Sequence, residues 1–305
     1  MTELHLKYRP QTFKDVIGQP EACKVLNDLG KRGETPHALL LTGGSGTGKT
    51  TIARILARKL KCDMKYDFFE MNGADKSKIE DMRWLIRHAA ASPLRGPCRI
   101  WLIDECSRIS GDGQECLLKL LEDYPSTTYF FLCTTDPQKL KRAIQTRCTE
   151  IRCKPISEKD LILLVNSVSE KEGLKCFPSV AKAIAESSGG SARQAVKLLN
   201  SVIGLVDEKE QLAVINNQST EQSPSQFIGR LLMNPKSTWK EYQAALAEID
   251  DASAEGIRIG VARYMQAVLL KSGQDRAGIV MEEFVDPIFS SAGLVYACWR
   301  IVKGL

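Results

Sequence analysis

The sequence contains no apolar run of the roughly 18 residues that a membrane-spanning helix requires. Its opening segment, Met1–Lys7, also lacks the charged region followed by an apolar one that marks a secretory signal. These absences argue against a membrane protein and against a secreted one. We expect no membrane partner and a location in the cytoplasm, or in the host cytoplasm if the source is viral.

Residues that usually bind zinc are few and poorly spaced. The ten cysteines form no Cys-x-x-Cys pair, and the chain has only three histidines. This spacing argues against a zinc site and indicates free thiols in a reducing compartment. A strong charge of one sign is absent as well, because the net charge is only +5. That value permits nucleic-acid binding without requiring it.

What the sequence does contain, over residues 1–155, is an alternation of short apolar runs with amphipathic stretches. The predicted strands are His37–Thr42, Tyr66–Met71, Arg99–Asp104, Tyr129–Thr134 and Thr149–Cys153. The helices predicted between them are Ile52–Lys61, Lys78–Ala91, Gln114–Asp123 and Gln138–Ile144. Such alternation is typical of a parallel sheet covered by helices on both faces. We therefore predict an α/β fold with a parallel five-stranded sheet.

Beyond Pro155 the strand-like runs stop. Helices are predicted at Ser157–Lys171, Ser179–Ser187 and Ala192–Leu205. The polar stretches 207–210 and 216–225 are interpreted as a loop, and helical periodicity returns from Gln226. The predicted modules are an α/β core (1–155), a helical lid (156–210) and an all-α C-terminal domain (222–305). Its aromatic residues are predicted to form bundle core and subunit contacts: Tyr264, Phe284, Tyr296 and Trp299.

A phosphate-binding motif, G-x-x-x-x-G-K-[ST], lies between an apolar strand and a helix that opens with Thr51. Its residues are Gly43, Gly44, Ser45, Gly46, Thr47, Gly48, Lys49 and Thr50. Glycines let successive backbone N–H groups curl around phosphates, and the helix N-terminus adds positive potential. We expect Lys49 to reach the β- and γ-phosphates of ATP, and the Thr50 hydroxyl to bind Mg²⁺.

A second apolar strand ends in two carboxylates, Asp104 and Glu105. In a chain that carries a phosphate loop, this pair suits an aspartate that binds the metal and a glutamate that activates water. Two solvated acids at a strand end would be the simpler interpretation without that loop. We therefore predict an ATPase in which Glu105 is catalytic and Asp104 binds Mg²⁺.

At this point residues 4–205 resemble the AAA+ sliding-clamp loader subunits: bacterial tau and gamma, the replication factor C small subunit, and the phage clamp-loader large subunit. The similar segments are Lys7–Phe13, Val16–Gln19, Lys78–Arg83, Leu117–Glu122 and Thr134–Leu140. The resemblance implies an AAA+ P-loop NTPase fold with a three-helix lid and a C-terminal collar for oligomerisation. It also implies an adenine site bordered by Tyr8, Arg9, Pro10, Val16 and Ile17. The zinc module of tau and gamma is missing after Cys62, which favours the replication factor C or phage type.

The same resemblance assigns three further residues. Thr135, together with Thr134, corresponds to the sensor of the γ-phosphate. Arg147, in a Thr-Arg-Cys motif where the family has Ser-Arg-Cys, corresponds to the finger that enters the neighbouring subunit's ATP site. Arg193 corresponds to the second sensor, in the lid. A cation near a helix N-terminus is disfavoured by the dipole, and a residue placed against local preference often serves a ligand. For Arg147 and Arg193, a solvated arginine that contacts no ligand remains the alternative.

DNA contacts are predicted at the start of the helix near residue 78. Ser77–Glu80 is a capping-box pattern, and backbone N–H groups at such a start favour phosphate. The candidate contacts are Lys76, Ser77, Lys78, Arg83 and Arg108. A solvated basic helix end is the alternative.

The function implied by the resemblance is ATP-driven clamp loading in an oligomeric spiral. The expected partners are copies of this chain, at least one other clamp-loader subunit, the sliding clamp and primer-template DNA, and the expected cofactors are ATP and Mg²⁺. Two alternatives remain. One is another AAA+ DNA motor for branch migration or helicase loading, and the other is a structural ring subunit that binds nucleotide without hydrolysing it.

Overall fold

The computed structural model describes residues 3–75, 79–174, 176–220, 224–235, 237–247 and 249–303. It divides into two compact units, Met1–Leu212 and Ala213–Leu305. The boundary predicted at residue 155 falls inside the first unit. Among the described residues, no helix combines the length and the apolar composition needed to cross a bilayer.

The first unit is built on a parallel sheet with strand order β2-β3-β4-β1-β5. The strands are β1 (Ala38–Gly43), β2 (Phe68–Asn72), β3 (Arg99–Asp104), β4 (Thr128–Thr134) and β5 (Thr149–Cys153). The helices before and between them are α1 (Leu4–Lys7), α2 (Pro20–Arg32), α3 (Lys49–Lys59), α4 (Ile79–Ala89), α5 (Gly111–Glu122) and α6 (Arg142–Arg147). The predicted α/β fold with a five-stranded parallel sheet is confirmed. Because β4 lies between β1 and β3 and all three are parallel, their carboxyl ends lie at one edge of the sheet, where such sheets bind ligands.

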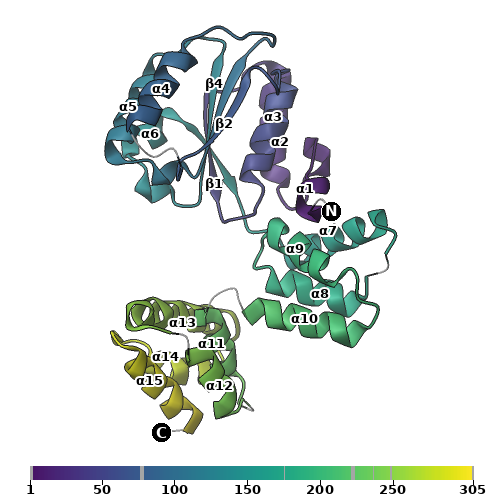
Figure 1. Ribbon diagram of the computed structural model, residues 1–305, viewed down its shortest axis with the longest axis vertical. Helices are drawn as coiled ribbons and strands as arrows, with labels where there is room; N and C mark the ends of the chain where they lie inside the picture. The colour runs from purple at the N-terminus through teal and green to yellow at the C-terminus, as the bar shows by residue number, and fades with distance from the viewer. Residues whose placement is uncertain are drawn as a thin grey trace. The chain divides into compact units, whose positions relative to one another are not determined.

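Alternate residues of the central strands pack on opposite faces of the sheet. Leu39 and Leu41 of β1 join a core cluster with helices α2 and α3, whereas Leu40 joins a cluster with α4, α5 and α6. Figure 1 shows these two helical layers on either side of the strands. Since both faces are buried, the strands read as continuous apolar runs. All ten cysteines are free thiols. Six of them are buried members of these two clusters: Cys23, Cys62, Cys98, Cys106, Cys133 and Cys153.

A helical subdomain follows β5 within the first unit. It contains α7 (Glu158–Lys171), α8 (Pro178–Ser187) and α9 (Ala192–Val202), followed by α10 (Glu208–Thr220), which crosses the boundary between the units. Ser157 caps α7 by accepting a hydrogen bond from the Asp160 N–H, and Ser191 caps α9 in the same way from Gln194. The three predicted lid helices are therefore present in Figure 1 as α7, α8 and α9.

Two local predictions were wrong. The polar stretch taken as a loop is largely helix α10, whose start is favoured by the acidic residues Glu208 and Glu210. The sequence did not predict this helix because its apolar residues show little helical periodicity. In the structure, the Gln211 side-chain amide donates a hydrogen bond to the Leu205 carbonyl at 2.6 Å. The helix predicted at 138–144 is instead a short 3-10 turn followed by α6. Here the Gln114 amide binds the Lys139 carbonyl and the Lys141 N–H, in place of helical hydrogen bonds.

The second unit is helical in its described residues. It comprises α11 (Pro224–Met233), α12 (Trp239–Leu246), α13 (Asp251–Ser272), α14 (Asp275–Glu283) and α15 (Ser291–Lys303). Its core includes Tyr242 and Phe284, both fully buried. Tyr296, in contrast, is 60% exposed and stacks on Trp299. The predicted C-terminal helical domain is thus present.

Candidate nucleotide-binding site

The phosphate-loop motif forms the turn between β1 and α3. Gly43 and Gly46 have backbone φ angles of 140° and 72°, a region that residues other than glycine rarely adopt. A Cβ atom on Gly43 would lie 2.1 Å from the Cys153 carbonyl oxygen, and one on Gly46 would lie 2.0 Å from the Ser191 Oγ. Glycine at these positions therefore lets the loop pass against β5 on one side and the start of α9 on the other.

Lys49 and Thr50, the first residues of α3, face the inside of this turn. The Lys49 ammonium donates to the carbonyl oxygens of Gly43 and Gly44 at 2.7 and 2.8 Å. The Thr50 hydroxyl donates to Asp104 Oδ2 at 2.8 Å. The structure therefore brings the predicted metal ligands from α3 and β3 together. Hydroxyl and carboxylate oxygens are ligands that Mg²⁺ accepts, so this pair fits the ion expected from the sequence.

Glu105 follows β3 in a left-handed backbone conformation with φ of 49°, which is uncommon for a residue with a side chain. Its N–H donates to Asp104 Oδ1 at 3.0 Å, and its carboxylate accepts a hydrogen bond of 3.4 Å from the Thr135 hydroxyl. Thr134 behaves differently: it is fully buried, and its hydroxyl accepts from the Asp136 N–H. Of the two threonines, only Thr135 contacts Glu105.

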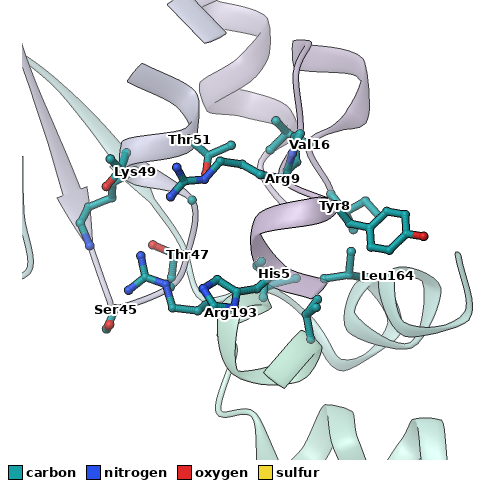
Figure 2. Close-up of a pocket in the computed structure, with 18 of the residues that line it drawn as sticks. His5, Tyr8, Arg9, Val16, Ser45, Thr47, Lys49, Thr51, Leu164 and Arg193 are labelled. Carbon is teal, nitrogen blue, oxygen red and sulfur yellow. The ribbon is translucent and has the colours of Figure 1, made fainter. Parts of the chain in front are cut away.

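A pocket lies between the phosphate loop, the N-terminal segment and the lid (Figure 2). Its empty volume is about 960 Å³, including the part open to solvent. The predicted residues that line it are Tyr8, Arg9, Pro10, Val16, Ile17, Ser45, Gly46, Thr47, Gly48, Lys49, Thr50, Thr51, Asp104, Glu105 and Arg193. Gly43 and Gly44 are not among the lining residues, and their carbonyl oxygens accept hydrogen bonds from the Lys49 ammonium.

The sequence analysis missed several lining residues, namely His5, Asp15, Ile156, Leu164, Ala192 and Val196. They come from α1, the turn before α2, the chain that enters the lid, and helices α7 and α9. No motif marks them, since only the packing of the lid on the core places them here. Burial lowers the pKa of His5, as do the cations Lys197, Arg193 and Arg9, whereas Glu3 opposes them. A neutral imidazole is therefore favoured at this wall of the pocket.

Two arginines point from their backbones toward the phosphate loop in Figure 2, Arg9 from the N-terminal segment and Arg193 from α9. Burial lowers the pKa of Arg9, and the neighbouring cations Arg54 and Arg193 lower it further, while Glu70 and Asp104 act in the opposite direction. The Arg193 N–H also approaches the Gly46 carbonyl at 3.5 Å. Cations gathered at one loop suit a polyanionic ligand.

Arg147 is not among the residues that line this pocket. It is the last residue of α6, where one guanidinium nitrogen donates to the Ala143 carbonyl at 3.0 Å and another pairs with Glu122 of α5. The pair is exposed, since Glu122 is 51% and Arg147 37% accessible. In this arrangement Arg147 does not contribute to the pocket of its own chain.

The predicted DNA contacts are mostly beyond what the structure describes. Lys76, Ser77 and Lys78 lie outside the described residues, as does the side chain of Arg83. Arg108 lies in the short 3-10 turn after β3 and is exposed. The DNA contacts therefore stay a prediction.

Comparison with known proteins agrees with this geometry. Residues 39–156 match the AAA family, the ATPase family associated with various cellular activities. The solved structure of the Holliday junction branch migration motor RuvB from Thermotoga maritima superposes with a TM-score of 0.58. That match covers 74% of this chain and 78% of RuvB at 23% identity, so it concerns the fold alone. The fold and the site define an AAA+ P-loop domain.

Relatives by sequence are replication proteins. The chain is 32% identical over 219 residues to DNA polymerase III subunit gamma of Buchnera aphidicola subsp. Schizaphis graminum, covering 65% of this chain and 60% of gamma. It is 30% identical over 275 residues to subunit tau of Escherichia coli K12, covering 82% and 42%. It is 33% identical over 205 residues to the replication factor C small subunit of Methanococcus maripaludis, covering 66% and 65%.

The resemblance predicted from the motifs is thereby confirmed: the chain carries an AAA family domain, and its homologues are clamp-loader ATPase subunits. The chain spans only 42–65% of the length of these three relatives.

Proposed function

We propose that this chain is an ATP-hydrolysing subunit of a sliding-clamp loader. It assembles with copies of itself and at least one other loader subunit into a spiral that opens the clamp and places it on primer-template DNA, and hydrolysis triggers release. One observation carries the proposal. The phosphate loop, the Thr50–Asp104 pair and Glu105 meet in one lid-covered pocket of a chain similar to tau, gamma and replication factor C.

In this proposal the phosphate loop binds the triphosphate through its backbone N–H groups and Lys49. The Lys49 ammonium exchanges its contacts with the Gly43 and Gly44 carbonyls for the β- and γ-phosphates. Thr50 and Asp104 would hold Mg²⁺, which when bound neutralises charge on the phosphates. The apolar residues Val16 and Ile17 contact the adenine.

Glu105 acts as the general base for the attacking water, a role that contributes roughly 10²–10⁴ in rate. The Thr135 hydroxyl holds the Glu105 carboxylate at the edge of the pocket. Arg193 contributes positive charge from the lid. Arg147 enters the pocket of the neighbouring protomer and stabilises the transferring phosphoryl group, where arginine fingers contribute on the order of 10³–10⁵.

The proposal is tested with the complex that co-purifies when the chain is expressed with its source's replication proteins. ATP hydrolysis should rise on addition of the sliding clamp and primed DNA, and a Lys49→Ala variant should abolish it. Stimulation by four-way junction DNA but not by a clamp would favour the branch-migration alternative. Nucleotide binding without turnover under all conditions would favour the structural ring subunit.

DNA binding is a separate part of the proposal. Lys76 and Lys78 would contact duplex phosphates without reading bases, and each such contact releases counterions. Replacing both by glutamine should lower the slope of log affinity against log salt by roughly two. A slope equal to that of the unaltered protein would contradict these two contacts while leaving the ATPase proposal untouched.

A further inference from the structure

Gln19 is a buried amide that joins two segments of the main chain far apart in the sequence. It precedes α2 and is only 3% exposed. Its Nε2 donates to the Lys154 carbonyl at 2.6 Å and to the Thr47 carbonyl at 3.2 Å, and its Oε1 accepts from the Lys154 N–H at 3.1 Å. The orientation of the amide follows from its partners, since the two carbonyls can only accept and the N–H can only donate.

The two segments that Gln19 joins are the phosphate loop and the chain that enters the lid. Thr47 lies within the loop, and Lys154 lies between the end of β5 and the start of α7. Ile156, two residues on, lines the nucleotide pocket, and its N–H donates to the Gly190 carbonyl just before α9 at 3.0 Å. The Lys154 main chain is therefore connected, through Ile156, to the start of the lid and to the turn between α8 and α9.

The turn before Gln19 is fitted to the same segment. Gly18 has a φ of 79°, and a Cβ atom there would lie 2.5 Å from the Ile156 side chain. On its other side, the phosphate loop contacts α9 through Gly46, which abuts Ser191 and approaches the Arg193 N–H. The loop is thus held on one side by the lid and on the other by the Gln19 amide, which binds the strand leading into the lid.

We propose that Gln19 is a positioning residue for nucleotide binding, which fixes the phosphate loop relative to the entry of the lid. This inference rests on the proposed function, because the loop is taken to bind ATP. Gln19 does not line the pocket, so it acts through the Thr47 carbonyl rather than on the ligand. A loop left free to move would lose part of its preorganisation for phosphate, and affinity would fall for ATP and ADP alike.

The test compares two replacements of similar length, Gln19→Glu and Gln19→Met. A glutamate keeps an acceptor for the Lys154 N–H but, when ionised, turns an oxygen toward two carbonyl oxygens. Burial and those carbonyls favour its protonated form, whose hydroxyl can donate to one of them. Methionine removes every hydrogen bond at any pH. Glu21→Gln is the matched control, since it breaks the exposed Lys154–Glu21 ion pair on the same segment.

Affinity is measured with a fluorescent non-hydrolysable ATP analogue at pH 8 and pH 6, each value relative to the unaltered protein. We expect Gln19→Glu to weaken binding roughly tenfold at pH 8, as when a buried hydrogen-bonding group is left unsatisfied, and to recover at pH 6. Gln19→Met should be weakened at both pH values, and Glu21→Gln at neither. Affinities of Gln19→Glu and Gln19→Met equal to that of the unaltered protein, even with a lower Tm, would overturn the inference.

A measurement without nucleotide separates this inference from the proposed function. Hydrogen–deuterium exchange should become faster in peptides covering 44–48 in both Gln19 variants, but not in Glu21→Gln. If the unaltered protein bound no ATP analogue, the proposed function would fail, and exchange alone would decide whether Gln19 holds the loop. Unchanged exchange at 44–48 in both variants would contradict the positioning role.

Discussion

The Thr135 hydroxyl donates a 3.4 Å hydrogen bond to the carboxylate of Glu105. The two residues follow the ends of neighbouring strands, β4 and β3, so the sheet itself sets their separation. Thr134, one residue earlier, turns into the core instead. The relationship predicts different effects for replacing Glu105, Thr135 and Thr134.

Glu105→Gln should retain ATP binding and lose turnover. The amide can occupy the place of the carboxylate but cannot accept a proton from water, so kcat should fall by roughly 10²–10⁴. The check is steady-state hydrolysis in the assembled complex beside analogue binding, with the exposed Glu34→Gln as control. Near-normal stimulated hydrolysis in Glu105→Gln would show that another group is the base.

Thr135→Ala should lower kcat by roughly tenfold with little change in the free energy of unfolding, because it removes a single hydrogen bond at the protein surface. Thr135→Ser should restore the rate. Thr134→Ala should instead destabilise the fold by about 1–2 kcal/mol, since it leaves the Asp136 N–H without its acceptor. Denaturant unfolding and hydrolysis rates of the three variants distinguish these cases; equal kcat losses for Ala and Ser at 135 would count against a role of the hydroxyl.

Glu122→Gln should leave stability nearly unchanged, although it breaks the ion pair with Arg147. Exposed pairs of this kind contribute about 0–1 kcal/mol. Because Arg147 is released rather than removed, hydrolysis in the assembled complex should be maintained or increased. A large loss of hydrolysis in Glu122→Gln would contradict this expectation, because it would show that hydrolysis requires an intact Arg147–Glu122 ion pair.

Asp67 connects stability to pH. Burial acts to raise its pKa, but hydrogen bonds from the Gly96, Leu94 and Arg95 N–H groups, together with the Arg99 guanidinium, lower it overall. A depressed folded-state pKa stabilises the fold above the unfolded value, near 3.8, and this contribution disappears as pH falls through the folded value.

Asp67→Asn should therefore cost about 2–4 kcal/mol of unfolding free energy at pH 7, and the cost should shrink below about pH 4. Denaturant titrations at pH 7 and pH 3 make the comparison, with the exposed Asp112→Asn as control. A cost that is the same at both pH values would contradict the lowered pKa.

The parts of the fold that sequence could predict are those whose pattern is local. The predicted strand Arg99–Asp104 coincides with β3, because a buried apolar run reads clearly, and the predicted strand Thr149–Cys153 coincides with β5, in which exposed polar and buried apolar residues alternate toward its end. The phosphate loop could be predicted from its glycines and the apolar strand before it alone. Local pattern failed where a distant side chain decides the backbone, as Gln114 does at residues 139–141.

The candidate site shows the same division. Lys49, Thr50, Asp104 and Glu105 lie together as predicted from their motifs. His5 and Leu164 reach the pocket only because α1 and α7 pack around it, and Gln19 matters only through carbonyls 28 and 135 residues away. Contacts of that sequence separation leave no periodic trace, so tertiary structure is needed to find them.

The central claim is that ATP is held between the phosphate loop of one protomer and Arg147 of the next. Mixing two inactive variants, Arg147→Ala and Glu105→Gln, tests it directly in the reconstituted complex. At a mixed interface the Arg147→Ala protomer supplies an intact pocket, and the Glu105→Gln protomer supplies the missing arginine. Recovery of clamp- and DNA-stimulated hydrolysis in the mixture is the predicted result, whereas a mixture as inactive as either variant alone would contradict the claim.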